Sequence, residues 1–245
     1  MQKQITEWEP KNFNLEKTSV WSFPIHGDWA THDSKWRGNW SPYIPRNLIL
    51  RYTKEGEIIL DQFAGGGTTL VEAKLLKRNI IGVDINDLAL ETCSKKIDFS
   101  WDTPFEPIIR KGDACNLNFI KTNSIDFICT HPPYADIIKY SKHLEGDISC
   151  FDRSVFLKKM EKVASESYRV LKKNKKCAIL IGDIRKKGLV QPLGFEVMNI
   201  FIEKGFQLKE IILKKQHNCK STGEWENISV SNNFLLLAHE YLFVF

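Results

Sequence analysis

The sequence predicts an α/β fold in which a mostly parallel sheet is covered by helices on both faces. Short apolar runs alternate with longer stretches of helical periodicity from about residue 45 onward, which is the pattern of β-α-β units. The chain has 245 residues, of which 42% are hydrophobic, so it can bury one sizeable core. Four of the apolar runs end in unusual polar, glycine or proline residues, and ligands of such sheets bind at the carboxyl ends of strands.

The first part of the sheet is expected to consist of two strand-helix units. Residues 57–61 form a short apolar run followed by a Gly/Thr turn, and residues 79–84 form the second such run, so both are expected to be strands. A helix over 70–76 connects them. A second helix, over 87–96, follows.

Two further strands and a long helix are expected next. Residues 108–110 and 124–130 are apolar runs of strand length. The segment 155–171 has apolar side chains at helical spacing, and Asp152 or Ser154 is its expected N-cap.

The last part of the chain is expected to close the sheet with an antiparallel hairpin. Residues 177–181 form the fifth apolar run, and a helix over 195–204 is ended by Gly205. Residues 207–213 and 241–245 are the two hairpin strands, which brings the expected sheet to seven strands.

The first 45 residues are rich in tryptophan, proline and charged residues and lack periodicity, so we expect an extension wrapped on the core. Residues 46–245 are then a single domain. There is no run of about 18 apolar residues, and the N-terminal residues lack the apolar segment of a secretory signal. We therefore expect a soluble, cytoplasmic protein without membrane contact.

The net charge and the cysteine content exclude only a few kinds of partner and site. The net charge of +5 is compatible with a polyanionic partner but is shared by many proteins that bind none. The six cysteines are far apart, with no Cys-x-x-Cys pair and no histidine at metal-ligand spacing. We expect reduced thiols and no bound metal.

The first unusual turn runs from Asp61 to Thr69. Gly65 and Gly67 let the backbone approach a ligand there, and amides at the helix start face it. The Walker lysine is absent, and Leu70 stands where a dinucleotide fingerprint has its third glycine, so a phosphate loop is disfavoured. An acidic residue at the start of the turn suits an ammonium group.

Carboxylates also follow the second and third strands. Asp84 lies where a side chain of this fold class binds ribose hydroxyls, and Asp113 is placed to accept a hydrogen bond from an adenine amine. Taken singly, a glycine turn, a helix cap and a loop carboxylate explain these residues. Their order at successive strand ends predicts a cationic cofactor that contains adenosine.

The fourth strand end carries Thr130-His131-Pro132-Pro133-Tyr134. Two consecutive prolines fix φ and remove two backbone donors, which leaves carbonyl oxygens free to accept from a ligand. Tyr134 offers a flat face for stacking. A planar group that bears an amine, such as a nucleobase, suits this arrangement.

These motifs resemble those of the S-adenosylmethionine-dependent DNA amino-methyltransferases. The family's glycine motif commonly reads Asp-Pro-Phe-x-Gly-x-Gly-Thr-Thr, and Asp61 to Thr69 match it except that Gln62 replaces proline. The family's catalytic tetrapeptide is Asp, Asn or Ser followed by Pro-Pro and an aromatic residue, and His131 departs from it. The resemblance covers about residues 25 to 245 and implies a Rossmann-like methyltransferase fold.

Two less specific segments extend the resemblance. The segment from Thr31 through Arg46 looks like the N-terminal cofactor-side motif, which abuts the methionine end of the cofactor. Residues 182–185 and 188–192 resemble the loop after the fifth strand, especially in cytosine-N4 enzymes.

The resemblance and the strand-end reasoning assign residues to three roles. The catalytic residues are expected to be His131, Pro132, Pro133 and Tyr134. S-adenosylmethionine is expected to contact His32, Asp61, Phe63, Ala64, Gly65, Gly67, Thr68, Thr69, Asp84, Ile85, Asp113 and Ala114. Nucleic acid is expected to contact Arg185 and, in small recognition loops near 135–153 and 214–234, Lys139, Tyr140, Lys214, Gln216, His217, Asn218 and Lys220.

An exocyclic amine is a poor nucleophile because its lone pair is conjugated with the ring, and hydrogen-bond acceptors draw out its protons. The resemblance gives these acceptor roles to the His131 side chain and the Pro132 carbonyl, with Tyr134 stacked on the base. Neutral imidazole has one acceptor nitrogen, and an ordinary pKa near 6.5 predicts loss of rate at acid pH. The alternative is that His131 only packs in the loop.

The sequence does not decide which group accepts the methyl group or which partners the protein binds. The first expectation is N4 of a flipped-out cytosine in double-stranded DNA, and N6 of adenine is the main alternative. Guanine N2 of an RNA, glutamine of a protein, and a nucleic-acid-binding subunit without activity are further alternatives. A cognate restriction endonuclease and a homodimer are the expected candidates for protein partners.

Overall fold

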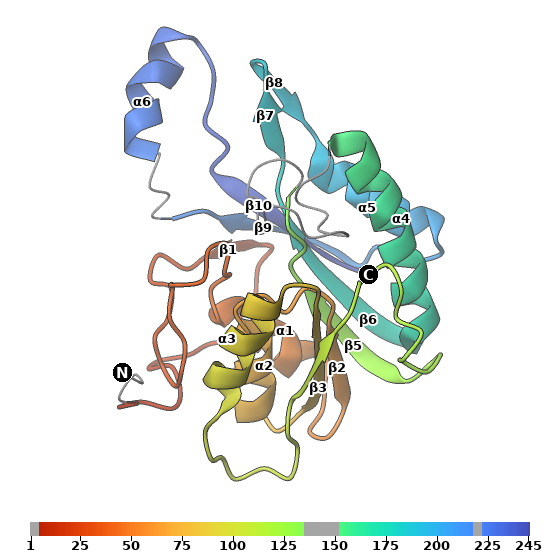
Figure 1. Ribbon diagram of the computed structural model, residues 1–245. Helices are drawn as coiled ribbons and strands as arrows, with labels where there is room; N and C mark the ends of the chain where they lie inside the picture. The colour runs from red at the N-terminus through yellow and green to blue at the C-terminus, as the bar shows by residue number, and fades with distance from the viewer. Residues whose placement is uncertain (1–4, 135–151, 218–221) are drawn as a thin grey trace.

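The computed structural model describes residues 5–134, 152–217 and 222–245. In chain order its elements are β1 (Val20–Ser22), α1 (Tyr43–Tyr52), β2 (Ile58–Asp61), α2 (Thr68–Leu75), β3 (Asn79–Asp84), α3 (Asp87–Ile97), β4 (Ile108–Lys111), β5 (Ile125–Thr130), α4 (Arg153–Val170), β6 (Leu171–Ile181), β7 (Ile184–Lys186), β8 (Leu189–Gln191), α5 (Leu193–Glu203), β9 (Glu210–Lys215), α6 (Thr222–Ser231) and β10 (His239–Val244). The predicted α/β fold class is confirmed (Figure 1).

A single mixed sheet forms the centre of the molecule. In the described part of the chain it has eight strands in the order β1-β9-β10-β6-β5-β2-β3-β4. Five pairs are parallel, and β10 is antiparallel to both of its neighbours. The expected terminal hairpin is therefore present as β9 and β10. The eighth strand, which the sequence did not predict, is β1 at the edge of the sheet.

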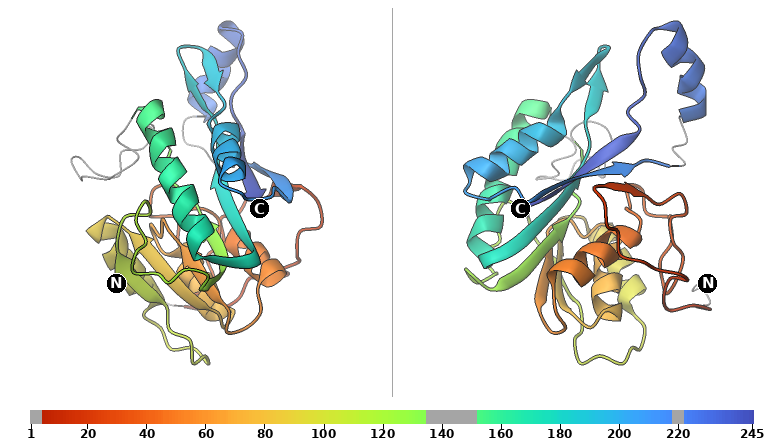
Figure 2. Two further views of the ribbon diagram at one scale, coloured as in Figure 1. Left: turned by 90° about the vertical axis from the view of Figure 1, so that its right-hand side faces the viewer. Right: turned by 180° about the vertical axis from the view of Figure 1, so that it is seen from behind.

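Helices cover both faces of this sheet, as Figures 1 and 2 show, with α1 to α3 on one face and α4 and α5 on the other. Successive side chains of a strand point to opposite faces. Ile59 and Phe127 accordingly join the cluster that includes α1 and α2, whereas Leu60 and Ile128 join the cluster that includes α4 and α5. Burial on both faces explains why these strands are apolar without alternation.

The N-terminal segment contributes more regular structure than expected. The strand β1 pairs in parallel with β9, and Val20 lies opposite Leu213. Three residues are too few to show strand periodicity, so only the partner strand defines β1. The helix α1 begins at Tyr43 and has Pro45 in its first turn, where a missing N–H costs no hydrogen bond. The expected domain division after residue 45 falls within this helix and remains a prediction.

Two other elements were not predicted, and both project from the sheet (Figure 1). The β7–β8 hairpin turns through Lys187 and Gly188, which have φ of 52° and 79°. The helix α6 lies before β10 in the chain. The strand β6 also begins at Leu171, earlier than expected, so the lysine-rich run 172–176 belongs to this strand.

The helices α3 and α4 each begin with a side-chain N-cap. The predicted N-cap of α4 is confirmed, because Asp152 Oδ1 accepts from the backbone N–H groups of Ser154 at 2.8 Å and Val155 at 3.1 Å. Asn86 caps α3 by accepting from the Leu88 N–H at 3.0 Å. Of the helices in the described ranges, none is both long and apolar enough to cross a membrane.

Candidate active site

An open cavity lies at the carboxyl ends of β2 to β5. The predicted residues that line it are Asp61, Phe63, Ala64, Gly65, Asp84, Ile85, Asp113, Ala114, His131 and Pro133. The structure thus brings the cofactor motifs and part of the His-Pro-Pro-Tyr motif to one space.

The glycine turn forms one wall of the cavity. Gly65 and Gly67 have φ of 48° and 82°, in the left-handed region that favours glycine. The Gly65 N–H donates to Asp84 Oδ2 at 2.9 Å, which ties this turn to the end of β3. A Cβ at Gly66 would lie 2.7 Å from the Cβ of Trp36, so the indole packs directly on the turn.

Asp61 is buried at the end of β2, where its side chain is fixed by two donors. Its Oδ1 accepts from the Thr130 hydroxyl at 2.9 Å and from the Phe63 N–H at 3.1 Å. Burial raises the pKa of Asp61 to about 6, although the hydrogen bonds lower it. A cation bound in the cavity would therefore stabilise the ionised form of Asp61.

The carboxylates of Asp84 and Asp113 are also fixed by hydrogen bonds from nearby donors. Asp84 accepts at Oδ1 from the Asn86 N–H at 2.9 Å, in addition to its bond from Gly65. Asp113 Oδ1 accepts from the Cys115 N–H at 2.8 Å. An ionised carboxylate has about four acceptor positions, so backbone bonds orient these groups and leave capacity for hydroxyl or amine donors.

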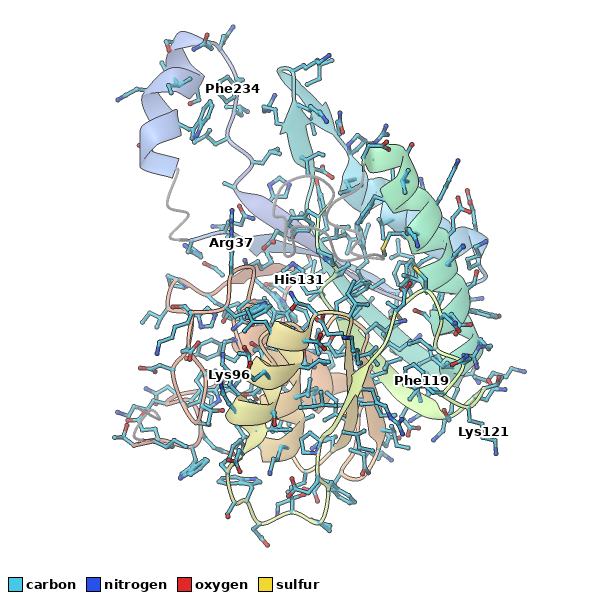
Figure 3. All side chains as sticks on the ribbon, in the orientation of Figure 1. Arg37, Lys96, Phe119, Lys121, His131 and Phe234 are labelled. Carbon is cyan, nitrogen blue, oxygen red and sulfur yellow. The ribbon has the colours of Figure 1, made fainter. Side chains whose placement is uncertain are left out.

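His131 borders the same cavity as the glycine turn and lies near the middle of the molecule in Figure 3. Its ring stacks on Trp40 with centroids 5.6 Å apart and planes at 26°, and its Nε2 lies 3.2 Å from the Tyr134 hydroxyl. Burial lowers the pKa of His131 to about 4, and Lys214 adds to this effect while Glu240 opposes it. The pKa near 6.5 assumed from the sequence is therefore wrong, and the imidazole is neutral at physiological pH.

Tyr134 and Pro132 do not line the cavity. The Tyr134 hydroxyl donates to Glu240 Oε1, and Glu240 Oε2 accepts from Lys214 Nζ at 2.7 Å. The Tyr134 ring meets the His131 ring edge-on, with centroids 5.7 Å apart. The stacking role expected for Tyr134 remains a prediction.

Four of the residues predicted to bind the cofactor lie outside the cavity lining: His32, Gly67, Thr68 and Thr69. The His32 Nε2 is 2.7 Å from Glu72 Oε1, and both side chains are fully buried. Glu72 also accepts from Trp29 and Arg46. His32 therefore belongs to a buried network that joins the N-terminal segment to α2.

Several lining residues were not predicted: Trp36, Gly38, Asn39, Trp40, Gln62, Gly66, Asn86 and Gly112. The tryptophans come from the segment flagged as a cofactor-side motif, and their number in a stretch without periodicity was the available signal. Asn39 is tied to the start of α2, because its Oδ1 accepts from the Thr68 hydroxyl at 2.5 Å.

The structure describes some, but not all, of the residues that are expected to contact nucleic acid. Lys139, Tyr140, Asn218 and Lys220 lie outside the described residues. Arg185 donates to the carbonyls of Gly188 at 2.7 Å and Leu235 at 3.0 Å and lies over the ring of Phe234, which is labelled in Figure 3.

The other three candidates lie along and just after β9. Lys214 is only 15% exposed and is paired with Glu240. The Gln216 N–H donates to the Ala238 carbonyl at 2.9 Å, and His217 Nε2 lies 3.0 Å from the Ser22 hydroxyl. DNA contact by these residues remains a prediction. Among the described residues, no three His, Cys, Asp or Glu side chains are grouped as a metal site.

Comparison with curated proteins shows partial similarity to enzymes that methylate nucleic acid. The chain is 34% identical over 96 residues to the type II methyltransferase M2.DpnII of Streptococcus pneumoniae, which covers 38% of this chain and 34% of the relative. It is 35% identical over 98 residues to a tRNA (guanine(10)-N2)-dimethyltransferase of Methanothermobacter thermautotrophicus, covering 40% and 28%. The match thus spans about a third of the length of these relatives.

The fold and the sequence family agree with this similarity. An S-adenosylmethionine-dependent methyltransferase of Methanosarcina mazei superposes with a TM-score of 0.57 at 13% identity, covering 80% of this chain and 95% of that one. At this identity the likeness shows the fold alone. The family model for N6/N4 DNA methylases matches residues 1–95 and 125–245, which include the glycine turn, Asp84 and the His-Pro-Pro-Tyr motif but not Asp113. The chain therefore belongs to the N6/N4 DNA methylase family.

Proposed function

We propose that this protein transfers a methyl group from S-adenosylmethionine to N4 of a cytosine that is flipped out of double-stranded DNA. One observation carries the proposal: a single cavity joins the carboxylate ends of β2, β3 and β4 to His131 and Pro133. A donor site and an acceptor site that share one space are what direct group transfer requires.

The residues of the donor side fit S-adenosylmethionine by their chemistry. Asp61 is buried and reluctant to ionise, so the cationic methionine end would favour its charged form. Asp84 would take the ribose hydroxyls and Asp113 the adenine amine. Trp36 packs on Gly66 so closely that any side chain there would displace the indole, which keeps this wall of the site closed.

The acceptor side prepares the target amine. The cofactor supplies a methyl group on a positively charged sulfur. The neutral His131 imidazole accepts one amine hydrogen bond, and the Pro132 carbonyl is proposed to accept the other, so the nitrogen lone pair turns from the ring toward the methyl carbon. With the cofactor bound, the amine nitrogen would form a bond to the methyl carbon as the carbon–sulfur bond breaks, the sulfur would leave as a neutral thioether, and the positively charged product amine would release one proton to water. Flipping the base costs a few kcal/mol of unstacking energy.

The choice of cytosine is supported by Thr130 and by the segment 182–185, which resembles the loop of cytosine-N4 enzymes. Asp183 accepts from the Gly194 N–H at 2.9 Å and so fixes this segment against the start of α5. N6 of adenine is the first alternative, because the family model covers both acceptors. Guanine N2 of an RNA is the second, favoured by the similarity to the tRNA dimethyltransferase.

A restriction endonuclease is proposed as a functional partner because several relatives are type II methyltransferases. A homodimer would supply DNA-binding surface beyond this chain. Neither proposal affects the chemistry at the cavity.

Incubation with isotope-labelled S-adenosylmethionine and either mixed double-stranded DNA or total tRNA, followed by nucleoside mass spectrometry, tests the function. We expect N4-methylcytosine from DNA. N6-methyladenine or N2-methylguanine would identify an alternative acceptor, and absence of any methylated nucleoside would refute transfer. The matched control is Tyr134→Ala, which should retain cofactor binding and lose methyl transfer.

A further inference from the structure

Four side chains form a continuous chain of contacts behind the cavity, and two of them lie far from the recognised motifs in sequence. Lys214 on β9 and Glu240 on β10 are direct partners in the antiparallel register. Their side chains are 2.7 Å apart, and Glu240 accepts from the Tyr134 hydroxyl. The Tyr134 oxygen in turn lies 3.2 Å from His131 Nε2.

This chain of contacts is buried and closely packed. The side chains of Glu240, Lys214 and His131 are 7%, 15% and 16% exposed. A Cβ at Gly182 would lie 3.3 Å from Glu240 Cγ and 3.5 Å from the Tyr134 hydroxyl oxygen. Glycine at this position therefore leaves room for the two side chains to meet.

The charge of Glu240 determines the direction of each hydrogen bond in this chain of contacts. Burial alone would raise the pKa of Glu240. Lys214 and His131, together with the hydrogen bonds from Lys214 and Tyr134, outweigh burial and hold this pKa below its ordinary value. An ionised carboxylate only accepts, so the Tyr134 hydroxyl must donate to it. The Tyr134 oxygen is then the acceptor for His131, and His131 carries its proton on Nε2.

A neutral imidazole with its proton on Nε2 has its lone pair on Nδ1. No hydrogen bond to Nδ1 is found within the described part of the chain. Toward the described residues, the imidazole thus has one acceptor atom without a hydrogen bond. An Asp in the first position of the tetrapeptide accepts through either oxygen, whereas a histidine is useful only if the correct nitrogen is unprotonated.

We propose that Glu240 and Lys214 are positioning residues that act through Tyr134 to keep the His131 proton on Nε2, so that Nδ1 accepts a hydrogen bond from the target amine. The proposal rests on the proposed function for the identity of the amine. The proposal gives the Tyr134 hydroxyl a role of its own, separate from the stacking expected of the ring. It also accounts for an ion pair buried behind the site.

The variant Glu240→Gln tests the direction of the relay with almost no change in shape. Lys214 only donates, so it selects the amide oxygen of the glutamine and turns the amide NH2 toward Tyr134. The Tyr134 oxygen then accepts from the amide, and its hydroxyl donates to His131 Nε2. The His131 proton must move to Nδ1, which becomes a donor.

Nitrogen-15 NMR of histidine-labelled protein reads this proton position directly, and His131→Asn identifies the signals among the six histidines. We expect the Nε2–H form in the natural protein and the Nδ1–H form in Glu240→Gln. Tyr134→Phe keeps the ring and removes the relay, so both forms should appear. Tyr241→Phe removes the neighbouring hydroxyl on β10 and should leave the His131 signals unchanged. An Nε2–H form that stays predominant in Glu240→Gln would overturn the proposal, and so would an Nε2–H form without any Nδ1–H form in Tyr134→Phe if the first variant does not fold.

Kinetics give the second readout. By analogy with other imidazoles held in the wrong tautomer, Glu240→Gln should lower kcat by about 100-fold or more with an unchanged KM for S-adenosylmethionine. On a His131→Asn background the same change should have no effect, because asparagine accepts through its own carbonyl oxygen. An equal loss on both backgrounds would mean a merely structural role and would overturn the proposal. The expected tautomers without methyl transfer by any variant would uphold the relay and refute the proposed function instead.

Discussion

Replacement of Asp61 by asparagine should stabilise the folded protein at neutral pH while it weakens cofactor binding. Asp61 is 2% exposed, and its pKa is raised to about 6 by burial. The folded chain therefore holds this proton more tightly than the unfolded chain does. The energetic cost of the charge is fully present above about pH 6 and disappears as the pH falls toward 4.

The size of the effect follows from that shift. A rise from 3.8 to about 6 corresponds to about 3 kcal/mol of free energy of unfolding. This is an upper limit for the gain, because the amide must also fit the hydrogen bonds from Thr130 and Phe63. A gain of even about 1 kcal/mol would raise the melting temperature by about 2–4 °C in a chain of this size. Loss of a hydrogen bond to a charged group should weaken cofactor binding by about 10- to 100-fold.

Thermal unfolding of both proteins without cofactor, at pH 8 and at pH 4.5, measures the first effect, and isothermal titration calorimetry with S-adenosylmethionine measures the second. The stability difference should be present at pH 8 and much smaller at pH 4.5. Two results would refute the reasoning: an Asp61→Asn protein that is less stable than the natural one at pH 8, or one that binds the cofactor with unchanged affinity.

Three further predictions concern the same cavity. Asp84→Asn should weaken S-adenosylmethionine binding in calorimetry by about 10-fold or more, since it removes a charged acceptor, whereas exposed Asp87→Asn should have no effect. At saturating cofactor, kcat should stay constant from pH 8 to about pH 5.5 and fall only as the pH approaches 4, where His131 becomes protonated, so an inflection near pH 6.5 would contradict its assigned role. Gly66→Ala should displace Trp36, change the tryptophan fluorescence and weaken cofactor binding, and unchanged fluorescence and affinity would argue against the contact.

The strands at the centre of the sheet could be predicted because each is marked by its own run of apolar residues. Residues 79–84 are buried on both sides of the sheet and are apolar for that reason, and the predicted and observed bounds of β3 coincide. The glycine turn and the carboxylates were found for the same reason, since each directly follows such a strand. Their meeting at one cavity was predictable from the rule that parallel strands end at one edge.

The remaining features depend on contacts between distant residues. Glu240 lies 106 residues from Tyr134, and only the register of β10 brings it to the site. Trp40 reaches the cavity from a segment without periodicity. The lowered pKa of His131 arises from burial, which a sequence does not display for a residue in a proline-rich turn.

The position of β10 between β6 and β9 constrains the order in which the molecule can assemble. The strand β9 precedes β10 in the chain, yet within the described residues β9 and β1 are hydrogen-bonded to the rest of the sheet only through β10. Nearly all of the described chain must therefore be synthesised before this half of the sheet can close. Pairing over such long separations makes folding slow. Since Glu240 arrives on that strand, a partly made chain would hold the donor half of the site before the acceptor half is ready, and activity would begin only when folding is complete.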